Sequence, residues 1–436
     1  MNTQLASAAE ATALPERRAG LRASWYALLI LTLINSCHYL DRTVVSIVIE
    51  PIRREFSLTD GQLGMLTGLV YGLTFALAGI PLGFLVDRVD RRKLLSGLVL
   101  VWSGFTALAG LASSFASLLL ARMGVGAAEA GGSPTSMSLI SDLFPARLRS
   151  TAMGAFFLSM ALGGAASAFI GSYVAAHHGW RAAFLIAGIP GAICALLLLA
   201  TVKEPARGRM DAIAKLPEIT PSIGETLRFI AGQKALLHLL VAMPLAVMAI
   251  SAISAWLVAF FMRSHGLSLA QASQLAGINF GIFAALGSLL GGAISDRFGR
   301  QIARRRITFA AIVCLLGIPL TLGAVLIGNT ALAAACWFGL SVCAFATIPP
   351  TFGSAVSLVK PRMRGVTLAI IQVIVNLIGY GAAPYLTGVL SDWYGGPQSL
   401  RYALVTVIGI TLLWAMAHYL LSARTFERDT ARAAQF

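Results

Sequence analysis

Charged residues are scarce in this chain: Asp, Glu, Lys and Arg make up only 12% of its 436 residues. Soluble globular proteins contain about 25% charged residues, whereas 57% of this chain is hydrophobic. The mean hydropathy is +0.80. These values exclude a soluble globular protein. The apolar runs are also too long for a membrane barrel, whose strands alternate over segments of about ten residues.

The chain lacks the motifs of several enzyme and metal-binding classes. Its five cysteines lie in apolar runs, with neither a disulfide framework nor metal-ligand spacing. No H-E-x-x-H or G-x-S-x-G motif is present, so nothing indicates a metalloprotease or a serine hydrolase. We therefore expect no enzymatic activity, no metal and no cofactor. Residues 1–22 lack the apolar core of a signal peptide, and we expect them to form a disordered cytoplasmic tail.

Twelve hydrophobic segments are long enough to cross a bilayer, which takes about 20 residues. The predicted fold is an all-α polytopic membrane protein with two six-helix halves. We expect an N-terminal bundle (23–201), a cytoplasmic linker (202–226), a C-terminal bundle (227–422) and a cytoplasmic tail (423–436). The predicted spans are 24–49, 62–86, 94–113, 116–143, 150–175, 182–201, 235–262, 270–294, 307–327, 330–357, 365–391 and 400–422.

The net charge of +15 follows from where the basic residues lie. With both termini on one side, 26 of the 33 Lys and Arg residues fall on that side. Cytoplasmic loops carry such an excess, so we expect both termini in the cytoplasm and no nucleic-acid partner. Two arginines lie within spans, and five fall on the opposite side: Arg53, Arg54, Arg181, Arg263 and Arg401.

A loop pattern occurs twice. Residues 83–91 and 292–300 both read G-x-x-x-D-R-x-x-R, at equivalent places in the two halves and 209 residues apart. The duplicated loop resembles the signature of the major facilitator transporters, whose two halves are related by an axis along the membrane normal. A merely basic cytoplasmic loop is the alternative. The resemblance implies gating roles for Asp87, Arg88 and Arg91, and for the copies Asp296, Arg297 and Arg300, although Asp90 stands where the family usually has Gly.

Four charged residues lie well away from the ends of predicted spans: Asp41 and Arg42 in the first, and Arg122 and Glu129 in the fourth. Each costs about 2.5–3.5 kcal/mol on insertion scales, so such residues mark functional sites. Arg122 and Glu129 are seven residues apart and share a helix face. Cross-pairing of Arg42 with Glu129 and of Asp41 with Arg122 would offset much of the cost, but the sequence does not assign partners.

Arginine stays protonated, so only Asp41, Glu129 and His38 can carry a proton in this cluster. The pKa of a buried carboxylate depends on its burial and on its distance from a guanidinium. A rocking motion that changes either quantity can therefore couple to a proton gradient. A permanent salt-bridge cluster is the alternative, and His38 is equally consistent with a bond inside its own helix.

The substrate is expected to bind between the charged N-terminal half and a neutral C-terminal half. We predict contacts from Asn35, Tyr39, Arg42 and Arg122, with Ser254, Gln372, Asn376 and Tyr380 opposite. The last three recur at i, i+4 and i+8, one face of one helix. Helix–helix hydrogen bonding is the alternative for each polar residue. Further candidates in the C-terminal half are Ser251, Trp256, Asn279, Phe280, Thr347 and Pro349-Pro350.

Particular strings narrow the resemblance. Residues 35–42 read N-x-x-H-Y-L-D-R, and residues 119–134 read LLARMGVGAAEAGGSP. Together with SDLFP at 141–145 and GWRAAF at 179–184, they resemble bacterial Spinster-like proteins. The resemblance implies a proton-coupled carrier in a bacterial inner membrane, monomeric, for an amphiphilic lysophospholipid- or sphingolipid-like substrate. Arg42 and Arg122 suit an anionic headgroup, because Arg binds phosphate or carboxylate bidentately.

Three other functions remain as alternatives: an organic-anion or drug carrier on the same scaffold, a membrane-embedded enzyme, and a receptor or channel. The duplicated loop argues against a receptor or channel. The absence of a nucleophile–base pair or a metal set in the sequence argues against the enzyme.

Overall fold

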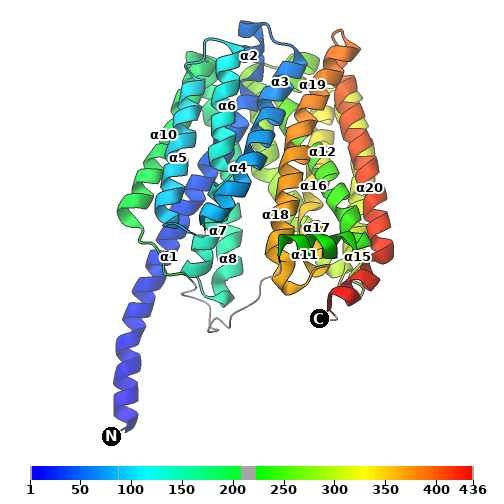
Figure 1. The fold of residues 1–436 in the computed structure, drawn as a ribbon. Helices are drawn as coiled ribbons and strands as arrows, with labels where there is room; N and C mark the ends of the chain where they lie inside the picture. The colour runs from blue at the N-terminus through cyan, green and yellow to red at the C-terminus, as the bar shows by residue number, and fades with distance from the viewer. Residues whose placement is uncertain (1, 87, 208–221, 435–436) are drawn as a thin grey trace.

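The computed structural model describes residues 2–86, 88–207 and 222–434, except for the side chains of residues 2–20, 146, 147, 150, 223 and 361. The described chain is helical, without strands, and Figure 1 shows two helical bundles side by side. Asp87 and residues 208–221 of the predicted linker lie outside the described residues.

The N-terminal half contains ten α-helices and two π-helical segments (η): α1 Asn2–Ile47, α2 Ile49–Phe56, α3 Asp60–Gly64, η1 Met65–Leu69, α4 Val70–Val86, α5 Arg91–Ala109, α6 Phe115–Glu129, α7 Gly132–Leu143, α8 Ala146–Phe157, α9 Ser159–Ala166, η2 Ser167–Gly171 and α10 Ser172–Thr201.

The C-terminal half contains ten α-helices, two π-helical segments and one 3₁₀ turn (η4): α11 Ile223–Ala231, α12 Lys234–His265, α13 Leu269–Ile278, η3 Asn279–Phe283, α14 Ala284–Phe298, α15 Arg305–Leu326, α16 Thr330–Ala346, α17 Ile348–Ser357, η4 Pro361–Met363, α18 Arg364–Ile374, η5 Val375–Ala382, α19 Ala383–Tyr394 and α20 Ser399–Ala434.

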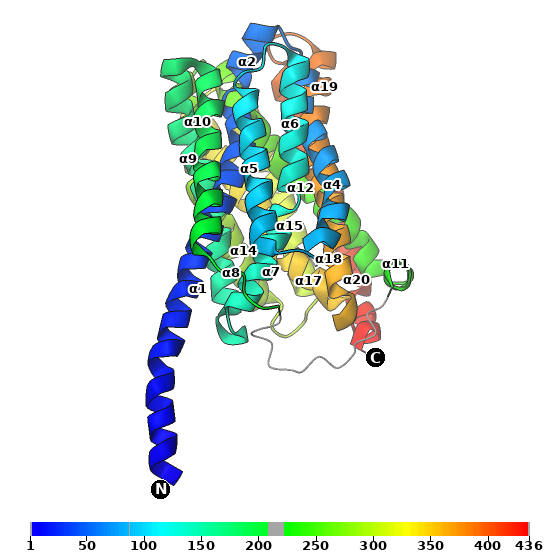
Figure 2. The same ribbon diagram turned by 60° about the vertical axis from the view of Figure 1, so that its left-hand side comes forward.

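Nine helical stretches of the described chain are long and apolar enough to cross a membrane. One of them, 151–201, reverses direction at Gly179, whose φ of 82° and ψ of 162° are non-helical. A positive φ suits glycine because it has no Cβ. The pair α6–α7 and the helix α5 run beside these stretches through the bundle (Figure 2). The arrangement is consistent with the twelve predicted spans.

Both chain termini lie at one end of the bundle, which we call the terminal end; the opposite end is the distal end (Figure 1). At the N-terminus the structure has helix from Asn2, where the sequence predicted a disordered tail. Six alanines, the strongest helix former, lie between residues 2 and 22. In Figures 1 and 2 this helix projects beyond the bundle.

At the C-terminus α20 continues to Ala434, so the predicted tail from residue 423 belongs to the bundle. The carboxylate of Asp429 accepts a 2.8 Å hydrogen bond from the backbone N–H of Ala235 in the first turn of α12. Such a bond satisfies one of the free N–H groups at a helix start. Asp429 is 1% exposed, so this contact explains why the last helix does not end at residue 422.

Each half contributes two π-helical segments to the contact between the halves. The segment η1 contacts η5 and α19, while η2 contacts α13 and η3 contacts α9. A π-helix bonds i to i+5 and widens the turn, and such segments are frequent at functional sites. Side chains beyond each segment therefore point in directions that a 3.6-residue period does not predict.

The short helix α11 leads into the C-terminal half. It begins with a capping box: the Ser222 hydroxyl accepts from the Glu225 N–H, and the Glu225 carboxylate accepts from the Ser222 N–H at 2.8 Å. In Figure 1 this helix lies across the terminal end of the bundle.

Candidate functional site

A buried carboxylate, Glu129, ends helix α6 in the N-terminal half. Its Oε2 accepts a 2.6 Å hydrogen bond from the Tyr71 hydroxyl and lies 3.1 Å from His38 Nδ1. The Glu129 side chain has no exposed surface, and a buried carboxylate needs such partners because desolvation costs several kcal/mol. The structure thus brings together two predicted proton carriers, His38 and Glu129. It adds Tyr71, which sequence reasoning missed.

The helix carrying Glu129 breaks directly after it. The helix α6 ends there and α7 begins at Gly132, with Pro134 in the first turn of α7, where its missing N–H is tolerated. The break separates the Glu129 carboxyl from the terminal half of the predicted fourth span.

Asp41 and Arg122 form a second buried pair, each only 1% exposed. Arg122 Nη1 donates a 3.3 Å hydrogen bond to the backbone carbonyl of Asp41 and not to its carboxylate. Neither carboxylate oxygen of Asp41 has a hydrogen-bond partner among the described residues. The suggested ion pair between these side chains is therefore not formed in this state, because the guanidinium binds the backbone of α1.

Arg42 packs on two aromatic rings. Its guanidinium carbon lies 3.9 Å from the centroid of the Tyr380 ring and 5.0 Å from that of the Tyr71 ring. Cation–π contacts contribute about 0.5–2 kcal/mol. The suggested pair between Arg42 and Glu129 is also not formed. Instead, Tyr71 joins them, with its ring beneath Arg42 and its hydroxyl on Glu129.

A cavity of about 70 Å³, which we call the central cavity, lies between the two halves beside Arg42. Arg42 is the one charged residue in its lining, which is otherwise apolar or hydroxyl-bearing. An anionic group entering the central cavity therefore meets a guanidinium without a carboxylate partner. Six residues selected from the sequence line it: Tyr39, Arg42, Ser251, Ser254, Phe280 and Tyr380.

Four predicted binding residues, Arg122 described above and three others, do not line the central cavity. The Asn35 amide donates a 2.6 Å hydrogen bond to the Ser159 hydroxyl, which joins α1 to α9. Asn376 donates to the Gln372 carbonyl at 2.8 Å, and the Gln372 side chain is exposed. Gln372, Asn376 and Tyr380 do not share one helix face as predicted, because η5 widens the turn and rotates Tyr380 away from the face of Gln372.

The other candidates in the C-terminal half do not line the central cavity either. The Trp256 Nε1–H donates to the Pro384 carbonyl at 3.2 Å, and the Thr347 hydroxyl donates to the Ala344 carbonyl at 2.7 Å. Asn279 is fully buried at the start of η3. Pro349-Pro350 lies in the first turn of α17, where proline fits a helix.

At the terminal end, Arg91 joins the first loop signature to its own half. Its Nη1 lies 2.5 Å from the Asp142 carboxylate and its Nε donates to Glu204 at 2.8 Å. Arg88 is exposed. Asp90 caps α5 by accepting a 2.9 Å bond from the Lys93 N–H. Its φ of −60° requires no glycine, which accounts for the departure from the family pattern.

The charged residues of the second loop signature are more exposed to solvent than Arg91 of the first. Asp296 pairs with Arg306 at 3.1 Å, and both side chains are exposed. Arg297 and Arg300 are exposed as well. The partner of Asp296 comes from its own half, at the start of α15. Among the described residues, no ion pair joins this Asp to the other half in this state.

At the distal end, Arg263 joins the two halves. Its Nε donates a 2.5 Å hydrogen bond to Glu50, and its Nη1 lies 2.8 Å from both carboxylate oxygens of Asp60. Asp60 also accepts from the Ser391 hydroxyl at 2.7 Å, and its backbone N–H donates to Asp392 at 2.8 Å. We call these five residues the distal gate. The hydrogen bonds that join the halves between described residues gather here.

Sequence reasoning missed the distal gate. The residues that face each other are far apart in the chain, with 213 positions between Glu50 and Arg263. One signal was present: glycine recurs at 64, 68 and 72, a small-residue spacing typical of closely packed membrane helices. A Cβ at Gly64, the last residue of α3, would collide with the Pro384 carbonyl, so glycine at this position lets α3 and α19 touch.

A further ion pair stabilises the distal end within the N-terminal half. Glu55 accepts hydrogen bonds from Arg181 Nη1 at 2.7 Å and from Trp180 Nε1 at 2.6 Å. These two bonds hold the pKa of the Glu55 carboxyl below its usual value. The Glu55 carboxylate is therefore engaged within its own half.

Comparison with known proteins agrees with this geometry. The profile described as Major Facilitator Superfamily matches residues 31–384. An "MFS-type efflux pump" of Mycolicibacterium smegmatis is 26% identical over 423 residues, covering 96% of this chain and 97% of that protein. Protein spinster homolog 1 of Homo sapiens is 28% identical, covering 86% and 75%. The zebrafish (Danio rerio) sphingosine-1-phosphate transporter SPNS2 is 26% identical, covering 93% and 85%.

Solved structures give the same result. A bacterial homologue of the human lysosomal transporter Spinster, in an inward-facing and unoccupied conformation, has a TM-score of 0.84 at 28% identity. That alignment covers 93% of this chain and 98% of the other. The inward-facing and occupied conformation has a TM-score of 0.79, covering 93% and 97%. This chain belongs to the Major Facilitator Superfamily, and within it is a Spinster-like transporter rather than an enzyme.

Proposed function

We propose that this protein is a proton-coupled carrier that moves a lysophospholipid- or sphingolipid-like anion across a bacterial inner membrane by alternating access. The main support for this proposal is the position of Tyr71. It contacts both Arg42, the proposed substrate-binding residue, and Glu129, the proposed proton-binding residue. A substrate anion that draws Arg42 away from the Tyr71 ring changes the surroundings of the Glu129 carboxyl. Substrate and proton binding are thereby linked through one side chain.

Two acids of this site have different surroundings, which supports different roles. Glu129 has two neighbouring donors, Tyr71 and His38, which suits an ionised carboxylate. The carboxylate oxygens of Asp41 have no hydrogen-bond partner among the described residues, and an uncompensated buried charge costs several kcal/mol. In this state we assign the bound proton to Asp41 and the negative charge to Glu129. His38 is a neighbouring donor to Glu129, and we propose that this contact changes when the charge of Glu129 changes.

Alternating access is supported by the closed distal gate. Arg263, Glu50 and Asp60 hold the two halves together at the distal end. At the terminal end, Arg91 and Asp296 pair inside their own halves. Similarity to two inward-facing structures fits this pattern. In the opposite state the distal gate parts and the signature loops bridge the halves at the terminal end.

The substrate class rests on the central cavity and on the relatives. Its one guanidinium suits a phosphate or carboxylate, and the apolar residues Met160, Ile250 and Phe280 suit an acyl or sphingoid chain. One relative is named as a sphingosine-1-phosphate transporter. The excess of Lys and Arg at the terminal end supports cytoplasmic termini. We take the working unit to be a monomer, because the central cavity is complete within one chain.

A panel of substrates in proteoliposomes tests the proposal. Purified protein is reconstituted with an imposed pH gradient, and the uptake of a fluorescent lysophospholipid is followed. We expect competition by lysophosphatidic acid and sphingosine phosphate, and at least about tenfold weaker competition when Arg42 is replaced by Gln, since a charge-assisted hydrogen bond is worth about 1.5–3 kcal/mol. Arg401→Gln, a change at the distal end, is the matched control.

The similarity to an efflux pump supports a second candidate, a drug or organic-anion carrier. The same assay separates the two. Competition by small hydrophilic acids or by cationic drugs, with none by the lysolipids, would replace the lipid assignment with this second function.

A further inference from the structure

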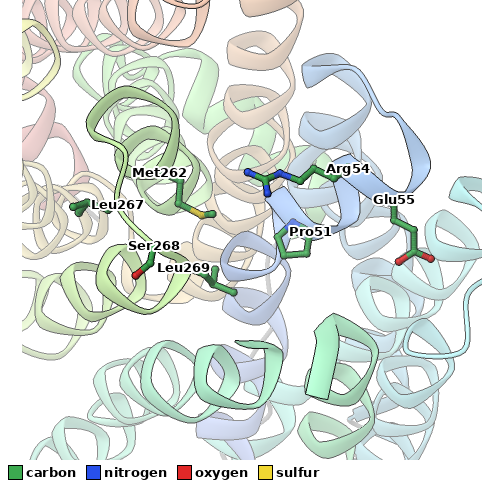
Figure 3. Close-up of a pocket in the computed structure, with 7 residues that line it drawn as sticks. All are labelled: Pro51, Arg54, Glu55, Met262, Leu267, Ser268 and Leu269. Carbon is green, nitrogen blue, oxygen red and sulfur yellow. The ribbon is translucent and has the colours of Figure 1, made fainter. Parts of the chain in front are cut away.

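A second cavity, which we call the distal cavity, lies between the halves at the distal end (Figure 3). It has a volume of about 680 Å³ and is lined by Pro51, Arg54 and Glu55 of α2 and by Met262, Leu267, Ser268 and Leu269 around the turn from α12 to α13. Ligand sites range over about 300–1,000 Å³. The distal cavity is thus large enough for a single-chain amphiphile.

The charges around the distal cavity leave one guanidinium without an acid. Glu55 is bound by Arg181, and Asp60 is bound by Arg263 and lies 3.6 Å from Arg53. No hydrogen bond or ion pair joins the Arg54 side chain to another described residue. In Figure 3, Arg54 extends over the cavity towards Met262 while Glu55 points away. The cavity therefore presents a positive charge that the nearby carboxylates do not neutralise.

The remaining wall is largely apolar. Pro51, Met262, Leu267 and Leu269 are only partly buried, although they belong to a folded bundle. An apolar wall with one cationic group at its rim matches an amphiphile: the chain covers the wall and an acidic headgroup meets the guanidinium. A small free anion would satisfy Arg54 but leave the apolar wall exposed, so the lipid is the occupant that accounts for both features.

Residues that line the distal cavity are adjacent in sequence to residues of the distal gate. Pro51 follows the gate residue Glu50 in α2, and Met262 precedes the gate residue Arg263 in α12. Separation of Glu50 from Arg263 must therefore move the two walls of the cavity apart. Occupancy of the cavity and the state of the gate are mechanically connected.

We infer that the distal cavity is a second binding site for a single-chain amphiphile with an acidic headgroup, which enters from or leaves to the distal leaflet, with Arg54 holding the headgroup. The inference rests on the proposed function, since it supplies the place where the substrate stops beyond the gate. It is a site separate from the central cavity and from Arg42.

A binding measurement without transport tests the inference. The native cysteines are replaced, Ala270→Cys beside Leu269 is labelled with bimane, and the protein is placed in nanodiscs. Lysophosphatidylglycerol with a nitroxide near its headgroup end is the probe. We expect saturable quenching, about tenfold weaker in Arg54→Gln, as expected for one charge-assisted hydrogen bond, and unchanged in Arg401→Gln. Arg401 also lies at the distal end but donates to the Ser264 carbonyl.

Three results would overturn the site. These are equal quenching in Arg54→Gln, equal affinity for a zwitterionic nitroxide lysophosphatidylcholine, and displacement by inorganic phosphate alone. Because the readout is binding, a failure of pH-driven uptake with quenching intact counts against the proposed transport and not against the distal site.

Discussion

The hydroxyl of Tyr71 donates a 2.6 Å hydrogen bond to Glu129. The ring of the same tyrosine lies 5.0 Å from the Arg42 guanidinium and 5.3 Å from that of Arg122. One side chain therefore contacts the acid and both arginines of the buried cluster. A movement of Arg42 towards a substrate anion is transmitted to Glu129 through this ring.

Replacing Tyr71 by Phe keeps the ring and removes the hydroxyl. We expect coupled uptake to fall about tenfold, because a hydrogen bond to a charged group is worth about 1.5–3 kcal/mol, and its pH profile to shift. Substrate affinity should change little, since the ring beneath Arg42 remains. The control is Tyr26→Phe, which removes an exposed hydroxyl bonded to Thr201. An unchanged pH profile in Tyr71→Phe would show that this hydroxyl has no part in coupling.

Replacing Arg263 by Gln should open the distal end. Glu50 is left buried without its cation, and Asp60 keeps only the more distant Arg53. Breaking a buried pair costs about 3–5 kcal/mol, and we expect the halves to separate. Spin labels attached at the exposed positions 113 and 270, one in each half, should report this separation as a longer distance between the two labels. The control Arg181→Gln breaks a distal ion pair inside one half and should leave the distance unchanged. Identical distances in both variants would contradict a gating role for Arg263.

Replacing Gly64 by Ala should prevent close contact between the halves. A Cβ at this position meets the Pro384 backbone, which cannot move as a flexible side chain does. We expect the same spin labels to show an opened distal end. Gly104→Ala is the control, because nothing lies within 4 Å of a Cβ there. If Gly64→Ala gave the same distance distribution as the native protein, a requirement for this close packing would be ruled out.

Acid should weaken the distal end through Glu55. A glutamate whose folded pKa lies below its unfolded value stabilises the fold above the unfolded pKa, and this contribution is lost as the pH falls. The lowered pKa of Glu55 comes from Arg181 and then Trp180. The native protein should therefore be more stable than Glu55→Gln at neutral pH. The difference should shrink as the pH falls below about 4.3, the ordinary pKa of a glutamate, and should be gone once the pH lies below the lowered pKa of Glu55. Thermal melting followed by Trp fluorescence measures it; a difference that persists in acid would contradict the assignment.

The membrane fold and the buried cluster could be predicted because both follow from the free energy of placing individual side chains in a bilayer. Apolar runs of about 20 residues have few other uses, and a charge such as Asp41 or Glu129 inside one requires a reason. The repeated loop marked the two halves. Apolar runs and buried charges are properties of short stretches of the chain, so they can be recognised before the fold is known.

What could not be predicted depends on contacts across the chain. The distal gate pairs Glu50 with Arg263 through the packing of two bundles, and no local pattern shows it. The polar face of Gln372, Asn376 and Tyr380 was wrong because η5 inserts a wide turn, which changes the period on which the prediction depended. Arg42 contacts aromatic rings and not the acids. A cation–π contact has no characteristic spacing in the sequence, so the sequence could not predict it.

The central claim is that Glu129 couples a proton to the movement of an amphiphilic anion. The most direct test measures fluorescent lysolipid uptake and internal pH together in proteoliposomes containing Glu129→Gln, with Asp90→Asn, a helix cap that Asn also fulfils, as control. We predict that Glu129→Gln binds the lipid but shows neither pH-driven uptake nor lipid-driven proton movement, while the control shows both. Normal uptake and proton movement in Glu129→Gln would contradict the account.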